Sequence, residues 1–496
     1  MKKNHNKYIT FFACLSVALA VAGYYLVLSK SSAPGDDIKQ QTFAALDAIK
    51  NDKRAEITRH FNEMGKNAHA IKDDKVMRNA FKSLISGRKE SQLEYAVDER
   101  YAHRYGDFYD ILFVDSSGYV FHSIKKERDY HSNLFTSPMA NNELAQALKR
   151  PDEEHFVEFN YYRPSNEPAA FFTVSLQERG QHIGWFVLQM STNSTNQILT
   201  KNHDFGRSSE VYLVNRNSLM LSNSRFIDDS TILRQKVDTL AVKAALDDNS
   251  GDRIIEDYRG VRVFSSFEKF DVLGVPWVII AEIDEDEVLT EFYKNHKKYF
   301  QKEFVRYLAQ TSRHEVETQP EELSRQRVDM NEFAKAEKGK TLATYGVASC
   351  TAVAVYYPGK FSYLAHVSPT DEIYQDSALS KLFLGRHYHN FLGELLARIE
   401  FFDLVPAQRR NLKVAIIAPH TQSFAKAVDA VLSHDLDLAN ITVLCDLDAL
   451  QGDVYVDASG TRLEVRWKEK NRLLAEDGLK RENLAQILKK IIRYDV

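Results

Sequence analysis

The stretch from Tyr8 to Leu28 constrains this chain more than any other segment, because it contains no charged residue and no proline. At about 1.5 Å per helical residue, it would span roughly 30 Å, which is the hydrocarbon thickness of a bilayer. Lys2, Lys3 and Lys7 precede it. The pattern predicts a cytoplasmic tip and one transmembrane helix over residues 1–29, and it leaves everything after Ser29 in one compartment.

Two other interpretations of this stretch remain open. A cleaved signal peptide usually has a shorter apolar region and a cleavage site of small residues. Here the run ends in Tyr24-Tyr-Leu-Val-Leu28, although Ser31-Ser-Ala33 offers a cleavage point. A lipid on Cys14 is disfavoured, because the apolar sequence continues past it. We therefore expect an uncleaved single-pass anchor in the inner membrane of a bacterium, with the body of the chain on the periplasmic side.

Charge and cysteine content exclude two classes of protein. The chain has 65 basic and 69 acidic residues among 496, so no bulk positive field favours nucleic acid. Three cysteines in so long a chain are too few for a disulfide scaffold. Cys14 lies inside the predicted anchor, and Cys350 and Cys445 could pair with each other only if their geometry allows it.

A helical pattern follows the anchor, and a strand pattern follows the helix. From Ile38 to about Glu99, apolar residues recur at helical spacing, which fits packing on the same domain or on a partner helix in a homodimer. Strand–turn–strand modules then begin at Asp110 and again at Glu210. Further strands are expected at residues 156–162, 170–176, 183–190, 261–267 and 277–283. This order predicts an α+β fold, with a long helix and two antiparallel sheets in tandem.

Several blocks of this region resemble a known family. They include the runs Tyr162-Arg-Pro-Ser-Asn-Glu-Pro-Ala-Ala-Phe-Phe172, Ile183-Gly-Trp-Phe-Val-Leu-Gln189 and Trp277-Val-Ile-Ile-Ala-Glu-Ile-Asp284. Residues 38–290 look like a double Cache domain, the PAS-like extracytoplasmic sensor of many bacterial chemoreceptors and sensor kinases. The resemblance implies a role in signal transduction and a small-molecule pocket within about residues 109–195. Within that pocket we expect Tyr162, Arg163 and Phe172 to contact the ligand.

The segment after the sensor-like region is charged rather than membrane-spanning. Residues 291–340 are expected to form a helical linker, whose aromatic residues from Phe292 to Tyr307 can share one face. Such an amphipathic helix fits either a membrane surface or a neighbouring domain. Residues 311–340 are expected to be an exposed connector.

The C-terminal region opens with two apolar strands around Pro358-Gly359, with Cys350 near the start of one strand and His366 near the end of the other. The midpoint of positions 350 and 366 falls at Pro358, so an antiparallel pair would place the thiol opposite the imidazole. Such a pair is the minimal nucleophile and base for attack on a carboxamide. The Thr344 hydroxyl could orient the ring or contact an oxyanion.

These residues also carry a resemblance. The pattern Thr344-x-Gly-x-x-Ser-Cys350, followed by an apolar strand and Ala365-His-Val367, is similar to the start of the chemoreceptor glutamine deamidases, the CheD family. The match covers residues 341–467, and residues 468–496 are expected to form a terminal helix. The resemblance implies an α/β sandwich, a Cys350 nucleophile, a His366 base and a catalytic-site threonine at Thr344. A protein glutamine would be the substrate.

Two functions follow for the whole chain. The first is a membrane-anchored extracytoplasmic sensor coupled to a Cys–His glutamine deamidase, that is, a hydrolase. The second is a non-catalytic sensory or interaction protein whose CheD-like domain is a binding module. No cofactor is expected, because no P-loop or dinucleotide fingerprint appears. No metal site is expected either, because His387 and His389 are spaced by two residues and so fall on different faces of a helix.

Overall fold

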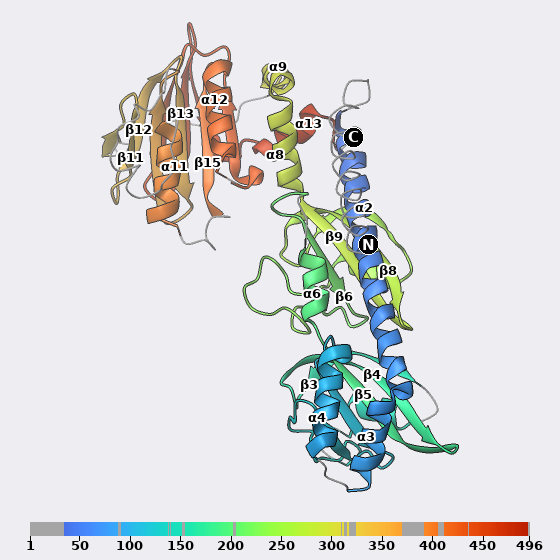
Figure 1. Ribbon diagram of the computed structural model, residues 1–496. Coiled ribbons are helices and arrows are strands. Elements are labelled where there is room, and N and C mark those ends of the chain that lie inside the picture. The colour runs from blue at the N-terminus through green and yellow to red at the C-terminus, as the bar shows by residue number, and fades with distance from the viewer. Residues whose placement is uncertain are drawn as a thin grey trace, which may run out of the picture. The chain divides into compact units, whose positions relative to one another are not determined.

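The computed structural model describes residues 34–87, 91–136, 138, 140–150, 154–201, 205–308, 310–311, 315–316, 324–369, 391–404, 411–434 and 436–494. The chain divides into two compact units (Figure 1). Residues 42–285 form the central unit. Residues 286–496, together with the chain up to residue 41, form the C-terminal unit. We describe each unit by itself.

The predicted fold class needs a correction at its first element. In the ranges given above, no helix is long and apolar enough to cross a membrane. The stretch at residues 8–28 lies outside the described residues. Over the described residues the fold is α+β, and the predicted N-terminal transmembrane helix is not supported.

The predicted long helix is in fact a series of shorter helices. They are α2 (Pro34–His69), the 3₁₀ turn η1 (Ala70–Asp73), α3 (Lys75–Ile85), α4 (Ser91–Arg100) and the π-helical turn η2 (Tyr101–Tyr105). The break has a local cause at Asp74, whose carboxylate accepts hydrogen bonds from the backbone N–H groups of Val76 and Met77 and so caps α3. Asp74 also binds Arg100 Nε at 2.6 Å, which holds α4 against the start of α3.

The first sheet of the central unit has five antiparallel strands in the order β2-β1-β5-β4-β3. They are β1 (Asp110–Asp115), β2 (Val120–Ser123), β3 (His155–Tyr162), β4 (Glu167–Glu178) and β5 (Gln181–Ser191). One face packs on the preceding helices, where the Phe81 ring meets Phe113 and Phe186. The other face packs under the segment between β2 and β3, which contains α5 (Glu143–Leu148). Both faces are buried, and for this reason β1 and β5 are almost continuously apolar.

The second sheet of the central unit has four strands in the order β6-β9-β8-β7. They are β6 (Glu210–Val214), β7 (Gly251–Glu256), β8 (Arg262–Val272) and β9 (Val275–Asp284), with α6 (Asn193–Thr200) before them and α7 (Leu240–Leu246) packed on one face. Strand β7 was not among the predicted strands, since its exposed Asp252 and Arg253 interrupt the apolar pattern.

The C-terminal unit is built on two five-stranded sheets that share one apolar core. The first has the order β10-β12-β17-β18-β19 and the second β11-β14-β13-β15-β16. The strands are β10 (Arg325–Arg327), β11 (Glu332–Lys335), β12 (Thr341–Val347), β13 (Thr351–Tyr357), β14 (Phe361–Val367), β15 (Lys413–Ala418), β16 (Ile441–Cys445), β17 (Gln451–Asp457), β18 (Leu463–Lys468) and β19 (Leu473–Asp477).

Helices cover the second of these sheets on the side away from the shared core (Figure 1). The two that contact it are α11 (Phe391–Phe402) and α12 (Thr421–Leu432). The remaining elements are α8 (Glu285–Asn295), α9 (Lys297–Leu308), η4 (Leu438–Asn440), η5 (Gly478–Lys480) and α13 (Leu484–Ile491). The result is a layer of helices on two packed sheets.

Two stretches differ from their expected structure. The expected connector contains β10 and β11, which pair with β12 and β14 and so belong to the sheets. The expected terminal helix begins with β19, paired with β18, and becomes helical only at Leu484. Their charged residues hid these strands, because edge strands expose charged side chains to solvent.

Gly184 in β5 tests the packing of the first sheet. Its φ is +147°, and an added Cβ would lie 2.1 Å from the Val114 carbonyl oxygen. We expect Gly184→Ala to destabilise the central unit by about 2 kcal/mol or more, because backbone on the neighbouring strand would have to move. Gly251→Ala, whose added Cβ meets only Phe267 at 3.9 Å, is the control. Equal melting temperatures for the two variants would contradict the assigned strand packing.

Candidate functional site

The sequence-predicted ligand residues do not lie together. Tyr162 ends β3 and is buried, Arg163 is exposed in the turn that follows, and Phe172 lies in β4. Alternation along β4 puts Phe172 on the helix-covered face, where its ring packs against Phe156. On the opposite face, the Phe171 ring contacts Tyr162 at 4.8 Å between centroids. Of the three predicted residues, the structure therefore brings Tyr162 to the face that the β2–β3 segment covers.

Asp129 is the partner of Tyr162 on that face. The Tyr162 hydroxyl donates to Asp129 Oδ2 at 2.7 Å, and Asp129 is 0% exposed. Backbone pairing fixes its position, because His131 N donates to Val120 O and Val120 N donates to Ser132 O. The segment between β2 and β3 thus runs beside β2 and turns the Asp129 carboxylate inward.

Other acceptor groups surround this pair. Glu127 precedes Asp129 by two residues and accepts from the Tyr109 hydroxyl at 2.7 Å. Glu167 opposes Tyr162 across the β3–β4 hairpin. Gln189 opposes both Phe171 and Asp110 in its sheet and is 0% exposed. We call Glu127, Asp129, Glu167 and Gln189 the acceptor cluster.

Each member of the acceptor cluster leaves a buried oxygen without a hydrogen bond. Within the described residues, these oxygens are Glu127 Oε2, Asp129 Oδ1, Glu167 Oε1 and Gln189 Oε1. A buried polar atom left unpaired costs about 1–3 kcal/mol, and native proteins contain few of them. These four oxygens can accept hydrogen bonds from donors outside the chain, which water or a ligand can supply.

The electrostatics agree with this geometry. The pKa of Asp129 is raised to about 6, chiefly because the carboxyl is buried. The Tyr162 hydrogen bond lowers this pKa, and the nearby Asp110 carboxylate raises it. Burial and the Glu127 charge likewise raise the pKa of Glu167. In the part of the chain that the structure describes, Glu127, Asp129 and Glu167 form no ion pair. The protein itself therefore supplies little to balance these charges.

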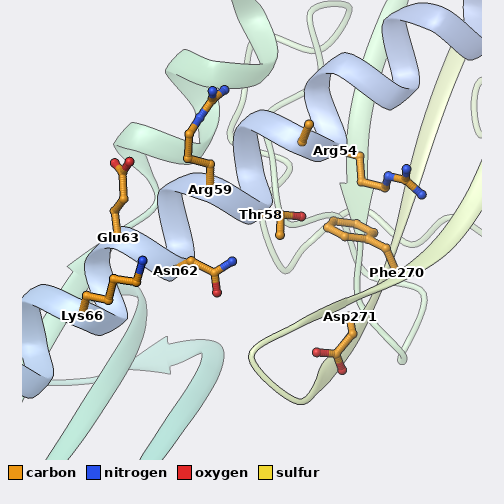
Figure 2. Close-up of a pocket in the computed structure, with 9 residues that line it drawn as sticks. Arg54, Thr58, Arg59, Asn62, Glu63, Lys66, Phe270 and Asp271 are labelled. Carbon is orange, nitrogen blue, oxygen red and sulfur yellow. The ribbon is translucent and has the colours of Figure 1, made fainter.

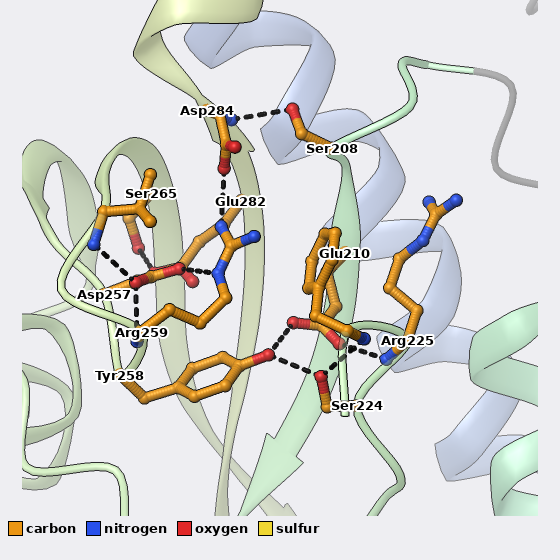
Figure 3. A network of polar contacts seen from close by, with 12 residues as sticks. Ser208, Glu210, Ser224, Arg225, Asp257, Tyr258, Arg259, Ser265, Glu282 and Asp284 are labelled. Atoms are coloured by element: carbon orange, nitrogen blue, oxygen red, sulfur yellow. Dashed lines mark hydrogen bonds and ion pairs between the residues drawn. The ribbon is translucent and has the colours of Figure 1, made fainter. Parts of the chain in front are cut away.

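The second sheet of the central unit shows how this chain satisfies buried carboxylates elsewhere (Figure 3). Glu282 accepts from Tyr212 and Ser265 at 2.9 and 2.7 Å, which lower its pKa, but complete burial outweighs them and raises it to about 8. Arg259 bridges Asp257 and Asp284 at 2.5 Å each. These carboxylates have donors from the chain itself, so this network needs no ligand.

An open groove runs beside α2, but its character is different (Figure 2). The residues that line it are Arg54, Ala55, Thr58, Arg59, Asn62, Glu63, Lys66, Phe270 and Asp271. Arg54 forms an ion pair with Glu268 at 2.5 Å. Mixed charges on a helix surface are typical of a solvated face, and we assign no ligand to this groove.

In the C-terminal unit, the hairpin register differs from the expected one. His366 pairs with Ala352, not with Cys350, because the turn is centred on Gly359, at φ +80°, rather than on Pro358. Cys350 lies in the bend just before β13 and packs in the same core cluster as Ala352 and Leu364, on the face of the sheet to which His366 belongs. Its thiol makes no hydrogen bond to His366 Nε2.

Hydrogen bonds fix the tautomer of His366. The Thr344 hydroxyl donates to the Val328 carbonyl at 2.8 Å, so its oxygen accepts from His366 Nδ1–H at 2.7 Å. The lone pair of Nε2 is then free to act as a base, and within the described chain this buried nitrogen has no hydrogen-bond partner. Burial lowers the pKa of His366, which keeps the ring neutral. Thr344 therefore orients the ring.

The Cys350 side chain is buried. It is 7% exposed, and its Sγ lies 3.8 Å from Sδ of Met330, which is 59% exposed. Burial raises its pKa above the ordinary value, against a smaller lowering by the Ser349 hydrogen bond. The thiol is therefore protonated at neutral pH. Cys350 and Cys445 are both free, so the two do not form a disulfide with each other.

The described residues contain no group of three or more His, Cys, Asp or Glu side chains arranged to hold a metal ion. His387 and His389 lie outside the described residues. Sequence reasoning did not single out Glu127, Asp129, Glu167 or Gln189. One acidic residue in a loop after a strand looks like any solvated loop residue, so no signal in a single sequence would have marked Asp129.

Comparisons with known proteins found similarity to solved structures alone. No family model matches the chain, and no curated protein matches it. A similar structure is the extracellular ligand binding receptor from Desulfohalobium retbaense, with 9% identity over 49% of this chain and 40% of that chain, at a TM-score of 0.36. This chain therefore covers less than half of that protein.

Two further similar structures are single sensor domains. The sensor domain of the V. cholerae histidine kinase DctB has 11% identity over 49% of this chain and 97% of that chain, at a TM-score of 0.37. The ligand binding domain of the Pseudomonas aeruginosa chemoreceptor PctC, solved with GABA, has 17% identity over 49% and 100%, at 0.35. All three are ligand-binding or sensor domains. Nothing in these comparisons supports the CheD-like interpretation of the C-terminal unit.

Replacing Asp129 tests whether its burial costs stability. Between its ordinary pKa of about 4 and its native pKa of about 6, the native state binds more protons than the unfolded state. Stability therefore falls as pH rises through this window. Asp129→Asn removes the charge, and its amide N–H₂ can donate to neighbouring carboxylates. We expect the variant to be more stable than the parent at pH 8, by roughly 2 kcal/mol, and equal to it at pH 4.

Thermal unfolding of the full chain at both pH values measures this difference. The control is Asp252→Asn, since Asp252 is exposed in β7 and its replacement should change neither value. If the Asp129→Asn chain is less stable than the parent at pH 8, the buried Asp129 charge does not destabilise the native state.

Proposed function

We propose that the central unit is a small-molecule sensor whose ligand binds between the first sheet and the segment joining β2 to β3. The observation that carries the proposal is the acceptor cluster, with its four buried oxygens that lack donors. A bound molecule would supply those donors and tie the segment to the sheet. The similar solved structures include a chemoreceptor domain bound to GABA and a histidine kinase sensor domain. We also propose that this unit lies outside the cytoplasm.

Binding at this position would change the mobility of identifiable segments. A panel of amino acids, amines, carboxylates and polyols is screened by thermal shift on the full chain. We expect any hit to slow hydrogen exchange in residues 124–134 and 162–171, because both segments border the acceptor cluster. Residues 210–214 and 275–284 of the second sheet serve as the internal control. A ligand that protects the second sheet and leaves the first unchanged would place the site elsewhere.

Substitutions then test individual contacts. Gln189→Leu keeps the volume of a fully buried side chain and removes its oxygen, so we expect ligand affinity to fall at least tenfold. Arg163, exposed in the turn after β3, remains a proposed ligand contact, which the alanine variant tests. Phe172 lies on the opposite face of the sheet, so Phe172→Ala should leave binding at this site unchanged. A homodimer through α2 likewise remains a proposal, which the mass of the full chain in solution tests.

We also propose a catalytic function for the C-terminal unit, as a Cys–His amidohydrolase that acts on glutamine side chains. One specific observation favours it, namely that Thr344 leaves the buried His366 Nε2 unprotonated on the face that Cys350 shares. Nε2 would take the thiol proton, and the thiolate would attack the carboxamide carbon. The amide nitrogen would then leave as ammonia, with the proton from the imidazolium. Water would hydrolyse the resulting thioester to a carboxylate.

Ammonia release from glutamine-containing peptides and from extracted membrane proteins tests this activity. We expect Cys350→Ala and His366→Ala to lose it by at least a hundredfold. Thr344→Val should lose most of it and Thr344→Ser should retain it, because only a hydroxyl can accept from Nδ1. Cys445→Ala removes the other free, buried cysteine and is the control. If the parent chain and Cys350→Ala behave alike, the C-terminal unit is a binding module instead.

A further inference from the structure

The turn formed by residues 328–331, between β10 and β11, borders the proposed catalytic site of the C-terminal unit. At the start of this turn, the Val328 carbonyl accepts from the Thr344 hydroxyl at 2.8 Å. At its end, the Asn331 backbone N–H donates to the His366 carbonyl at 2.7 Å. Both ends of the turn are thus tied to strands that carry the site, which holds the backbone of the turn in place.

Met330, which lies between these two ends, covers the Cys350 thiol. The two sulfur atoms are 3.8 Å apart, and the thiol is placed to donate to the thioether. Cys350 is 7% exposed, whereas Met330 is 59% exposed. A side chain that is open to solvent therefore lies directly on the buried candidate nucleophile.

This contact also directs the thiol hydrogen away from the base. His366 is 5% exposed, and its Nε2 has no hydrogen-bond partner among the described residues. Since the thiol donates to Met330, proton transfer from the thiol to the imidazole requires the thiol to leave the thioether. A thiol is a weak donor and a thioether is a weak acceptor, so this contact is easily broken.

The Met330 side chain can move while the turn stays closed. A methionine side chain is unbranched, has three rotatable bonds and adapts to a change of neighbours. The backbone next to it is held by a further hydrogen bond, which Ser368 N donates to Asn331 Oδ1 at 3.1 Å. Rotation of one side chain is therefore the smallest change that exposes the Cys350 Sγ.

We propose that the Met330 side chain is a gate that decides which molecules reach the Cys350 thiol. The proposal deepens the proposed amidohydrolase function and rests on it. An approaching substrate displaces Met330, whose thioether then lines the entrance as an apolar wall. The opening is only as wide as one side chain, so the gate selects slim reactive groups over bulky ones.

Alkylation of Cys350 in the full chain measures access to the thiol without any substrate. N-ethylmaleimide and fluorescein maleimide share one reactive group and differ in size, and peptide mass spectrometry follows each cysteine separately. We expect Met330→Ala to raise the rate of Cys350 labelling at least fivefold with the small reagent, and by a larger factor with the bulky one. Met330→Leu keeps the volume of the side chain and should stay within about twofold of the parent.

Two controls accompany these variants. Leu473→Ala replaces another exposed apolar side chain of the same unit and should leave both labelling rates unchanged. Cys445 is 4% exposed and reports unfolding of the unit, because its labelling should stay slow in every variant that remains folded.

Three outcomes would overturn the gate. They are equal Cys350 labelling in the parent and Met330→Ala, equal gains for the small and the bulky reagent, or a Met330→Leu chain that labels as fast as Met330→Ala.

The ammonia-release assay separates the gate from the function on which it rests. Faster labelling of Met330→Ala in a chain that releases no ammonia would remove the amidohydrolase and leave Met330 as the cover of the thiol. Ammonia release that depends on Cys350, together with unchanged labelling in Met330→Ala, would remove the gate alone.

Discussion

The hydrogen bond from Tyr162 to a fully buried Asp129 is the interaction on which the candidate sensor site depends. It joins the last residue of β3 to a segment that the chain reaches just after β2, so one contact ties both ends of the β2–β3 connection together. Burying a carboxylate is unfavourable unless donors surround it. Tyr162 donates to only one of the two carboxylate oxygens of Asp129. Among the described residues, the other members of the acceptor cluster also have one oxygen each without a donor.

The two sheets of the central unit resolve the same physical problem in different ways. In the second sheet, Arg259 and a set of hydroxyls satisfy the buried acids, and the network is closed. In the first sheet, Asp110 is likewise satisfied by Ser123 and by backbone N–H groups, whereas each member of the acceptor cluster has one oxygen without a partner among the described residues. Both sheets belong to one chain and have the same kind of architecture, so they can be compared directly for how their buried carboxylates are hydrogen-bonded. An open network costs folding energy unless something outside the chain completes it.

The C-terminal hairpin shows how a turn decides chemistry. The centre of the turn lies at Gly359 rather than Pro358, which shifts the strand pairing by two residues. A shift of two residues keeps every side chain on the same face of the sheet and changes only its partner on the neighbouring strand. Cys350, in the bend before β13, and His366 therefore stay on the core face of the sheet. Thr344 reaches the ring from β12 in the other sheet of the same unit. The arrangement of thiol, imidazole and hydroxyl thus draws on β12, β14 and the bend before β13, which only the packing of the two sheets brings together.

Much of the framework follows from local pattern. Alternating and continuous apolar runs predicted β1, β3, β4, β5, β6, β8 and β9, and the helical spacing before them was correct in type although Asp74 divides the helix. The hairpin with Cys350 and His366 was predicted from two apolar strands around a turn, since both signals are local. Residues 8–28 predicted a membrane-spanning helix, and they lie outside the described residues.

The tertiary structure alone decided which polar side chains meet. Asp129, Glu167 and Gln189 come from a loop and two strands, and their burial depends on how the β2–β3 segment folds back over the sheet. Burial changes the cost of a charge, and sequence cannot report burial for a single acidic residue in a loop. The sequence by itself determined most of the elements and their order, but not β7, β10, β11 and β19. The packing of those elements decided that four acceptors share one buried neighbourhood, because desolvation and missing donors exist only in three dimensions.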